Sequence, residues 1–194
     1  MRTEAFYNQF SLFYPLVDLF LRPQKRVLFE EVNKLPYGAL LEVGVGNGAH
    51  LPLYQTHKVT GIDTSRNMLE QASKRKGLAV ELLHMNGEAL SFPDSSFDYV
   101  VLAHVVAVVD HPEQLMREVY RVLKPGGKVF ILNHFTPNNW LKYIDRSFGP
   151  LSKRLHFRSL FYTTDLSALH LFSLLKEVSF GALSYFKLLM YVKK

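Results

Sequence analysis

The stretch LLEVGVGNG, residues 40–48, decides the fold of this chain together with KVTGID at residues 58–63. The first apolar segment runs into a loop with three glycines, and the second ends on Asp63. In a doubly wound sheet, the carboxyl ends of such strands open onto one crevice where ligands bind. Glycines let the backbone approach a ligand closely, and Asp63 is placed to accept hydrogen bonds from a ribose diol. We therefore expect a nucleoside-containing cofactor at this edge of the sheet.

The same glycines also fit a dinucleotide-binding fingerprint, Gly44-x-Gly46-x-x-Ala49. Glu42 argues against that interpretation because a carboxylate at the strand end would repel a pyrophosphate. It would attract a cationic ligand such as S-adenosylmethionine, which carries a sulfonium and an ammonium group. The chain also departs from the dinucleotide-binding layout after its fourth predicted strand. The sequence therefore favours S-adenosylmethionine over NAD.

Apolar segments and turn residues alternate along the chain as in α/β proteins. The pattern predicts helices at 65–76 (with Ser65 as N-cap), 112–123 and near 164–169, and strands at 39–45, 59–63, 80–85, 99–104, 128–133, 172–178 and 185–192. The residues Lys124-Pro125-Gly126-Gly127 predict a firm stop for the second helix. The last two strands are too close in sequence for a parallel crossover, so they must pair antiparallel.

Residues 5–34 are predicted to be helical, with apolar side chains spaced three and four residues apart and a break or restart at Pro15. The apolar surface is wider than a single stripe. Such a segment either packs on a core or lies in a membrane interface. The apolar run at 6–17 is too short to span a bilayer. It is also a poor secretory signal, because Glu4 and Asp18 interrupt the apolar N-terminus and no small-residue cleavage site follows. We therefore expect a cytoplasmic location.

The composition limits the remaining possibilities. A chain of 194 residues that is 48% apolar fits one well-filled domain. The absence of cysteine excludes disulfides, thiolate metal sites and cysteine nucleophiles, and the histidines and acids show no metal-ligand spacing. The net charge of +6 is concentrated in two clusters, Arg22, Lys25 and Arg26, and Lys142, Arg146, Lys153, Arg154 and Arg158. Both can be solvated faces, or they can attract an anionic surface. Lipid is favoured over nucleic acid because no nucleic-acid motif accompanies them.

Four stretches in order resemble the class I S-adenosylmethionine-dependent methyltransferases: residues 42–48, 61–65, 92–98 and 121–127. The resemblance covers about residues 38–134. It implies a three-layer, Rossmann-like α/β fold with a seven-stranded, mostly parallel sheet and a C-terminal antiparallel hairpin. It implies one domain over 1–194, in which 1–34 is a helical lid or membrane-contact segment, 38–134 the cofactor-binding core, and 135–194 the substrate-side segment and hairpin. The cofactor would be S-adenosylmethionine and the product S-adenosylhomocysteine.

The resemblance also implies which residues bind the cofactor. They are Glu42, Val43, Gly44, Gly46, Gly48, Asp63, Thr64, Met68, Asn86, Gly87, Glu88, Ala89, Ala103 and His104. Two of them depart from the family pattern. Asn86 stands where many relatives carry an acidic residue that contacts adenine, and His104 stands where relatives often have an aromatic. An amide oxygen at Asn86 can still accept a hydrogen bond from the adenine amino group.

Within that family, the chain resembles the short bacterial phosphatidylethanolamine N-methyltransferases. The features behind this are the Phe/Tyr-rich N-terminal helix with Arg22-Pro23, AVVDHP at 107–112 and NHF at 133–135. They imply stepwise N-methylation of the lipid amine toward phosphatidylcholine at the inner membrane surface. We expect a monomer without a nucleic-acid partner. Two alternatives stay open: a quinone-like or other small-molecule acceptor, and a cofactor-binding module without catalysis.

Methyl transfer to an amine moves positive charge from sulfur to nitrogen, which favours aromatic faces near the acceptor. The amine must first lose a proton, which a histidine at the pocket mouth can accept. The catalytic candidates are His134, at the end of the fifth predicted strand, and Tyr7 and Tyr14, which can cover the site from the N-terminal helix. His104, at the end of the fourth predicted strand, is a further candidate for the proton acceptor, although a pocket wall or a cofactor contact is the favoured role. His50 is expected to flank the cofactor.

Overall fold

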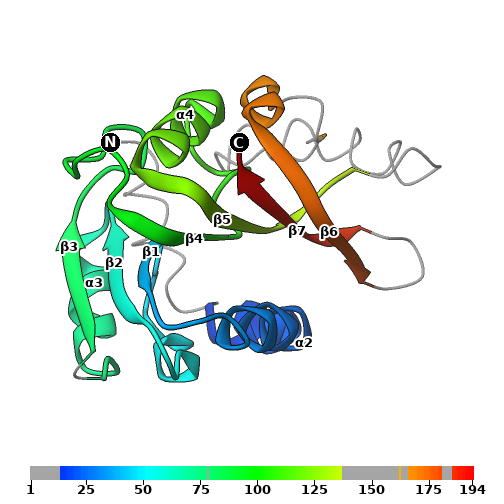
Figure 1. Cartoon of the computed structure of the whole chain (residues 1–194). Helices are drawn as coiled ribbons and strands as arrows, with labels where there is room; N and C mark the ends of the chain where they lie inside the picture. Colours follow the sequence, from blue (N-terminus) through cyan, green and yellow to red (C-terminus); the bar gives the residue numbers. More distant parts are fainter. Residues whose placement is uncertain (1–13, 78, 137–161, 163–165, 181–184) are drawn as a thin grey trace.

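The computed structural model describes residues 14–77, 79–136, 162, 166–180 and 185–194. Its centre is one seven-stranded sheet of order β3-β2-β1-β4-β5-β7-β6 (Figure 1). The strands are β1 Ala39–Val43, β2 Lys58–Asp63, β3 Val80–His84, β4 Phe97–Ala103, β5 Leu123–His134, β6 Phe172–Phe180 and β7 Phe186–Lys193. The first five are parallel, and β7 runs antiparallel to both β5 and β6. The predicted fold class and the C-terminal hairpin are confirmed.

Helices cover both faces of the sheet. In Figure 1, α2 (Tyr14–Asn33) lies below the sheet and α4 (Pro112–Val122) lies above it. Helix α3 (Arg66–Ser73) contributes to the same core as α2. Side chains of successive strand residues point to opposite faces, so each strand supplies both cores. The core below contains Leu28, Val32, Leu40, Val101 and Phe130. The core above contains Val100, Leu102, Leu115, Val119 and Ile131.

Two short 3₁₀ turns complete the described elements, η1 at Leu51–Leu53 and η3 at Ser167–Leu171. The second replaces the predicted helix near 164–169. It is held to α4 by Glu113, whose carboxylate accepts hydrogen bonds from the Ser167 hydroxyl at 2.7 Å and the Ala168 N–H at 3.0 Å. The N-cap at Ser65 is confirmed, because its hydroxyl accepts from the Met68 N–H at 3.3 Å.

Strand β5 begins five residues earlier than predicted, at Leu123. Helix α4 does stop at Val122, but the chain passes directly into the sheet, and Leu123 pairs with Phe97 across a register shift. Two features of the predicted stop make this possible. Gly126 adopts φ +72°, and a Cβ on Gly127 would lie 2.8 Å from the Lys124 carbonyl oxygen. The glycines that end the helix also form the irregular start of the strand.

The N-terminal helical segment is described from Tyr14 onward, and Pro23 lies inside α2. Residues 5–13 of the predicted 5–34 segment lie outside the described residues. Within the described part of the chain, no helix is both long enough and apolar enough to cross a bilayer.

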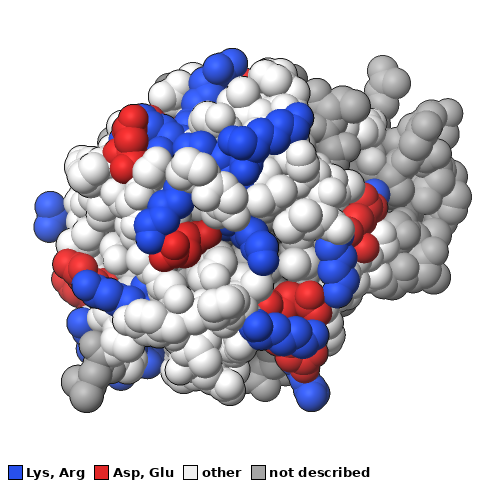
Figure 2. All heavy atoms as spheres, in the orientation of Figure 1, with Lys and Arg blue, Asp and Glu red and all other residues white. Residues whose placement is uncertain are grey.

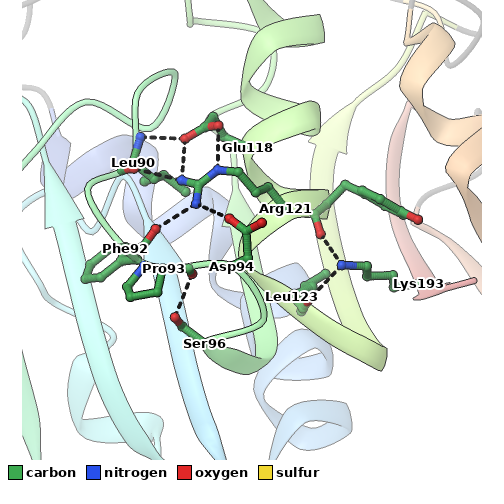
Figure 3. A network of polar contacts seen from close by, with 10 residues as sticks. Leu90, Phe92, Pro93, Asp94, Ser96, Glu118, Arg121, Leu123 and Lys193 are labelled. Carbon is green, nitrogen blue, oxygen red and sulfur yellow. Dashed lines mark hydrogen bonds and ion pairs between the residues drawn. The ribbon is translucent and has the colours of Figure 1, made fainter.

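Arg121 joins α4 to the segment that follows β3 (Figure 3). Its guanidinium donates to the carbonyl oxygens of Leu90 and Phe92 at 2.8 and 2.7 Å. It also pairs with Asp94 at 2.8 Å and with Glu118 at 2.9 Å. The hydrogen bonds from Arg121 lower the pKa of Glu118, and the Glu118 carboxylate in turn accepts from the Leu90 N–H at 2.8 Å. This network holds the segment at residues 90–94 against α4.

Candidate cofactor and acceptor site

The glycine loop after β1 has an open side and a packed side. Gly44, Gly46 and Gly48 all have positive φ, at +77°, +55° and +69°. A Cβ on Gly48 would lie 2.8 Å from the backbone of Ala72 in α3, whereas a Cβ on Gly46 would meet no atom within 4 Å. The loop is therefore pressed against α3 at Gly48 and leaves free space beside Gly46, where a ligand can approach the backbone.

Asp63, the last residue of β2, ties this loop to the start of α3. Its Oδ2 accepts from the Gly46 N–H and its Oδ1 from the Ser65 N–H, both at 2.8 Å. Burial raises the pKa of the Asp63 carboxyl above its ordinary value, and the backbone N–H groups partly oppose that rise. An ionised carboxylate has about four acceptor positions, so capacity remains for a ribose diol.

Glu42 lies in β1 just before the loop, and its side chain is fully buried. Its Oε1 is 2.6 Å from His50 Nε2. Its other oxygen, Oε2, and the Tyr54 hydroxyl are both buried, and neither makes a hydrogen bond with another described residue. Burial, with the nearby charge of Glu42, raises the pKa of Tyr54 well above its ordinary value. The sequence identified Glu42 but not its partners, because only the folded loop brings residues 50 and 54 back to β1.

The predicted adenine-side residues form a closed turn after β3. Asn86 Oδ1 accepts from the Glu88 N–H at 3.0 Å, and Glu88 Oε1 accepts from the His111 N–H at 2.8 Å. A Cβ on Gly87 would lie 2.6 Å from Cγ1 of Val43, so this turn packs directly against β1. Ala89 closes the turn with a backbone hydrogen bond to Asn86 at 3.1 Å.

The remaining predicted cofactor residues lie at the ends of β2 and β4 or in α3. Thr64 follows Asp63, and its carbonyl oxygen lies 2.9 Å from His84 Nε2. Met68 is buried in the first turn of α3. Ala103 ends β4, and His104 follows it with φ +60°, a conformation that is strained for any residue with a side chain. Strain of this kind is concentrated at functional sites.

A group of rings lies at the carboxyl ends of β4 and β5. The ring of His134, the last residue of β5, stacks on Tyr185 with centroids 5.6 Å apart. The His104 ring meets the Phe186 ring edge-on at 5.9 Å, and Tyr185 and Phe186 contact each other at 5.3 Å. The antiparallel register places Phe186 opposite His134. We call these four residues the ring group.

The ring group adjoins the glycine loop. Val105, next to His104, is so close to Gly44 that a Cβ there would lie 2.5 Å from Val105 Cγ2. The sequence identified His104 and His134 from their places at strand ends. It missed Tyr185 and Phe186, because only the pairing of β7 with β5 brings them to this edge.

The remaining predicted functional residues lie outside the described residues or at their edge. Tyr7 lies outside the described residues, and Tyr14 is the first residue of α2. The basic residues at 142–158 also lie outside the described residues. Among the residues that the structure describes, no three His, Asp or Glu side chains are grouped so that they could hold a metal ion.

Comparison with known proteins supports a methyltransferase domain that uses S-adenosylmethionine. A family model described as a methyltransferase domain matches residues 41–131. A phosphatidylethanolamine N-methyltransferase from Cereibacter sphaeroides is 48% identical over 105 residues, which cover 50% of this chain and 51% of that protein. A demethylmenaquinone methyltransferase from Listeria welshimeri is 44% identical over 84 residues, covering 41% of this chain and 36% of that protein. The chain thus spans about half or less of the length of these curated relatives.

Solved structures share the whole architecture. A crystal structure from Thermotoga maritima, described as an S-adenosylmethionine-dependent methyltransferase and possible histamine N-methyltransferase, superimposes with a TM-score of 0.75. It covers 98% of this chain and 99% of its own, at 24% identity, and so shows the fold. Asp63 and Glu42, which the sequence predicts as the acceptors of the cofactor's ribose and ammonium groups, both lie next to the open glycine loop. Residues 41–131 of the chain thus match a methyltransferase domain, and the chain is similar to S-adenosylmethionine-dependent methyltransferases in sequence and in fold.

Proposed function

We propose that the chain transfers methyl groups from S-adenosylmethionine to the amine of phosphatidylethanolamine and then to its methylated derivatives. The observation that carries this proposal is the ring group, which lies beside the glycine loop at the carboxyl ends of β4 and β5. The similarity to the Cereibacter sphaeroides enzyme supports the choice of lipid. Aromatic faces stabilise a cation, and the acceptor nitrogen becomes more cationic as it gains a methyl group.

The chain's own residues would bind the cofactor, orient the two reactants and remove a proton from the lipid amine. When bound, S-adenosylmethionine supplies an electrophilic methyl group. Asp63 would hold the ribose, and Glu42 the ammonium of the methionine portion. Tyr185 and Phe186 would face the positive charge on the acceptor nitrogen. His134 would take the proton that the lipid ammonium must lose before attack, and alignment of the two reactants supplies most of the acceleration.

Membrane contact would come from the N-terminal helical segment and the basic clusters. On the face that Figure 2 shows, Lys and Arg side chains are interspersed with Asp and Glu. Several described basic side chains are paired with acids, such as Lys176 with Glu31 at 3.0 Å and Lys187 with Glu177 at 2.7 Å. We therefore propose that the apolar N-terminal residues and the basic residues at 142–158 contact the lipid. Attraction of the basic residues to anionic headgroups would strengthen this contact.

A quinone-like acceptor is the second candidate, favoured by the 44% identity to the demethylmenaquinone methyltransferase. The two candidates differ in the atom that receives the methyl group. Carbon methylation of a quinol would require removal of a phenolic proton and would not leave a permanent cation beside the ring group.

Vesicle assays separate these candidates. Purified full-length chain is mixed with S-adenosylmethionine and vesicles of phosphatidylcholine alone, or with added phosphatidylethanolamine or demethylmenaquinol, and release of S-adenosylhomocysteine is measured. We expect release only with the amine lipid, and lipid mass spectrometry should detect its methylated products. Release only with demethylmenaquinol would overturn the lipid proposal, as would no release in any arm while S-adenosylhomocysteine still binds.

The role of His134 gives a prediction of its own. We expect His134→Gln to lower kcat on the amine lipid roughly 10- to 100-fold at neutral pH, because the proton acceptor is lost. The defect should shrink as pH rises, since more of the lipid amine is then already deprotonated. The exposed His170 provides the matched control, and His170→Gln should leave kcat unchanged. A defect of equal size at every pH would contradict proton transfer to His134.

A further inference from the structure

The buried group around Glu42 contains a histidine that the methyl-transfer chemistry does not use. Glu42 is 0% exposed and His50 is 7% exposed, and Nε2 of His50 lies 2.6 Å from Oε1 of Glu42. A carboxylate can only accept, so Nε2 carries the hydrogen. Leu51 begins η1 directly after His50, so the imidazole sits between the glycine loop and the next element of the chain.

Helix α2 holds the imidazole in place from the other side. The Phe29 ring, which is 3% exposed, stacks on His50 with centroids 5.4 Å apart and an interplanar angle of 27°. The same ring meets Tyr54 edge-on at 4.8 Å. His50 and Tyr54 are thus packed on one aromatic ring, and both are directed at the Glu42 carboxylate.

The second half of that carboxylate has no well-formed hydrogen bond among the described residues. Glu42 Oε2 and the Tyr54 hydroxyl are both buried, and neither has a partner there at full hydrogen-bond distance and angle. The hydroxyl is nevertheless close to the carboxylate, because burial and then the charge and hydrogen-bonding capacity of Glu42 raise the pKa of Tyr54. A buried carboxylate oxygen without a donor is costly, and a cation that donates hydrogen bonds relieves the cost. The group is therefore complete only when a donor, preferably a charged one, reaches Oε2.

We propose that His50 is a positioning residue for cofactor binding: it holds Oε1 of Glu42, so that Oε2 and the Tyr54 hydroxyl receive the ammonium of the cofactor's methionine portion. Tyr54 contributes its hydroxyl oxygen as a second acceptor. The proposal concerns the cofactor and does not depend on which acceptor is methylated.

Two ligands test it by binding alone. S-Adenosylhomocysteine carries the ammonium, whereas methylthioadenosine has the same adenosine and thioether without the amino-acid portion. In the full-length His50→Leu variant, Oε1 of Glu42 loses the hydrogen bond that fixes the carboxylate. The carboxylate is then no longer held with Oε2 toward the ammonium. Calorimetry should show S-adenosylhomocysteine binding about 10-fold or more weaker, and methylthioadenosine binding within about 3-fold of the original.

Further variants separate positioning from structure. His50→Gln places an amide nitrogen where Nε2 was and should restore most of the affinity. Tyr54→Phe should weaken only S-adenosylhomocysteine, by about 3- to 10-fold. His57→Gln is the matched control: His57 is also buried, but its Nε2 lies 3.0 Å from the Val32 carbonyl oxygen and its ring meets Tyr99. It should leave the ratio of the two affinities unchanged.

Thermal unfolding of each variant shows that the protein is folded at the temperature of the titration. If His50→Leu weakens both ligands equally, His50 only supports the loop and the proposal is wrong. Unchanged or tighter binding of S-adenosylhomocysteine relative to methylthioadenosine would also overturn it, because the imidazole would then compete with the ammonium for Glu42.

Discussion

Replacing Asp63 by alanine is expected to weaken S-adenosylhomocysteine binding at least ~100-fold. The substitution removes the acceptors of the Gly46 and Ser65 N–H groups, each now held at 2.8 Å, as well as the proposed acceptor of the ribose diol. The glycine loop would lose its tie to α3 at the same time as the ligand loses its contact. Titration calorimetry with the purified chain measures the change. Asp94→Asn is the control, because Asp94 pairs with Arg121 on the surface and its side chain is 76% exposed.

The raised pKa of Asp63 gives this prediction a pH dependence. Burial favours the protonated form of Asp63 in the folded chain. The protonated carboxyl therefore adds to the free energy of unfolding at any pH below the unfolded-state pKa. That contribution is lost as the pH rises through the folded-state pKa. Ribose binding needs the ionised form. Affinity for S-adenosylhomocysteine should therefore fall on acidification, at a pH above the ordinary range of an aspartate, and Asp63→Asn should flatten the profile. A variant that binds as tightly as the original chain would contradict the role of Asp63.

Two alanine substitutions in the glycine loop should fail in different ways. We expect Gly48→Ala to lower the free energy of unfolding by about 3 kcal/mol or more. Its Cβ would lie 2.8 Å from the Ala72 backbone at a φ of +69°, so α3 would have to move. Gly46→Ala should cost only about 1 to 2 kcal/mol, the strain of a side chain at positive φ. Urea unfolding followed by circular dichroism measures both values.

Ligand binding should distinguish the same two variants in another way, because the more stable one, Gly46→Ala, is expected to lose affinity. The Cβ of Gly46→Ala would enter the free space beside the loop, so this folded variant should lose S-adenosylhomocysteine binding about 100-fold. If Gly46→Ala binds normally, the free space is not where the ligand lies. If Gly48→Ala is as stable as the original chain, the loop is not packed against α3 as described.

The sequence predicts the local features of this fold well. The glycine loop, the carboxylate at the end of β2 and the Ser65 cap each depend on neighbouring residues, and all are present. The start of β5 was mispredicted because Gly126 and Gly127 signal a turn, while pairing of Leu123 with Phe97 draws the turn into the sheet. Tertiary pairing overrides the local signal there.

Only some residues of the candidate site could be predicted, because others are brought there by tertiary pairing. His104 and His134 could be identified because strand ends face the crevice in this kind of sheet. Tyr185 and Phe186 reach the same edge only through the antiparallel register of β7 with β5. The contact of His50 with Glu42 depends on the path of the loop between them. Neither relation leaves a periodic pattern in the sequence.

We propose that one crevice holds S-adenosylmethionine between Glu42 and Asp63 and directs its methyl group to the ring group. A crystal structure of the full-length chain with S-adenosylhomocysteine would decide this. We expect the ribose hydroxyls at Asp63, the ammonium at Oε2 of Glu42, and the sulfur facing His104, His134, Tyr185 and Phe186. A ligand with its ribose away from Asp63, or with its sulfur facing away from these four rings, would show that the cofactor does not bind in this way.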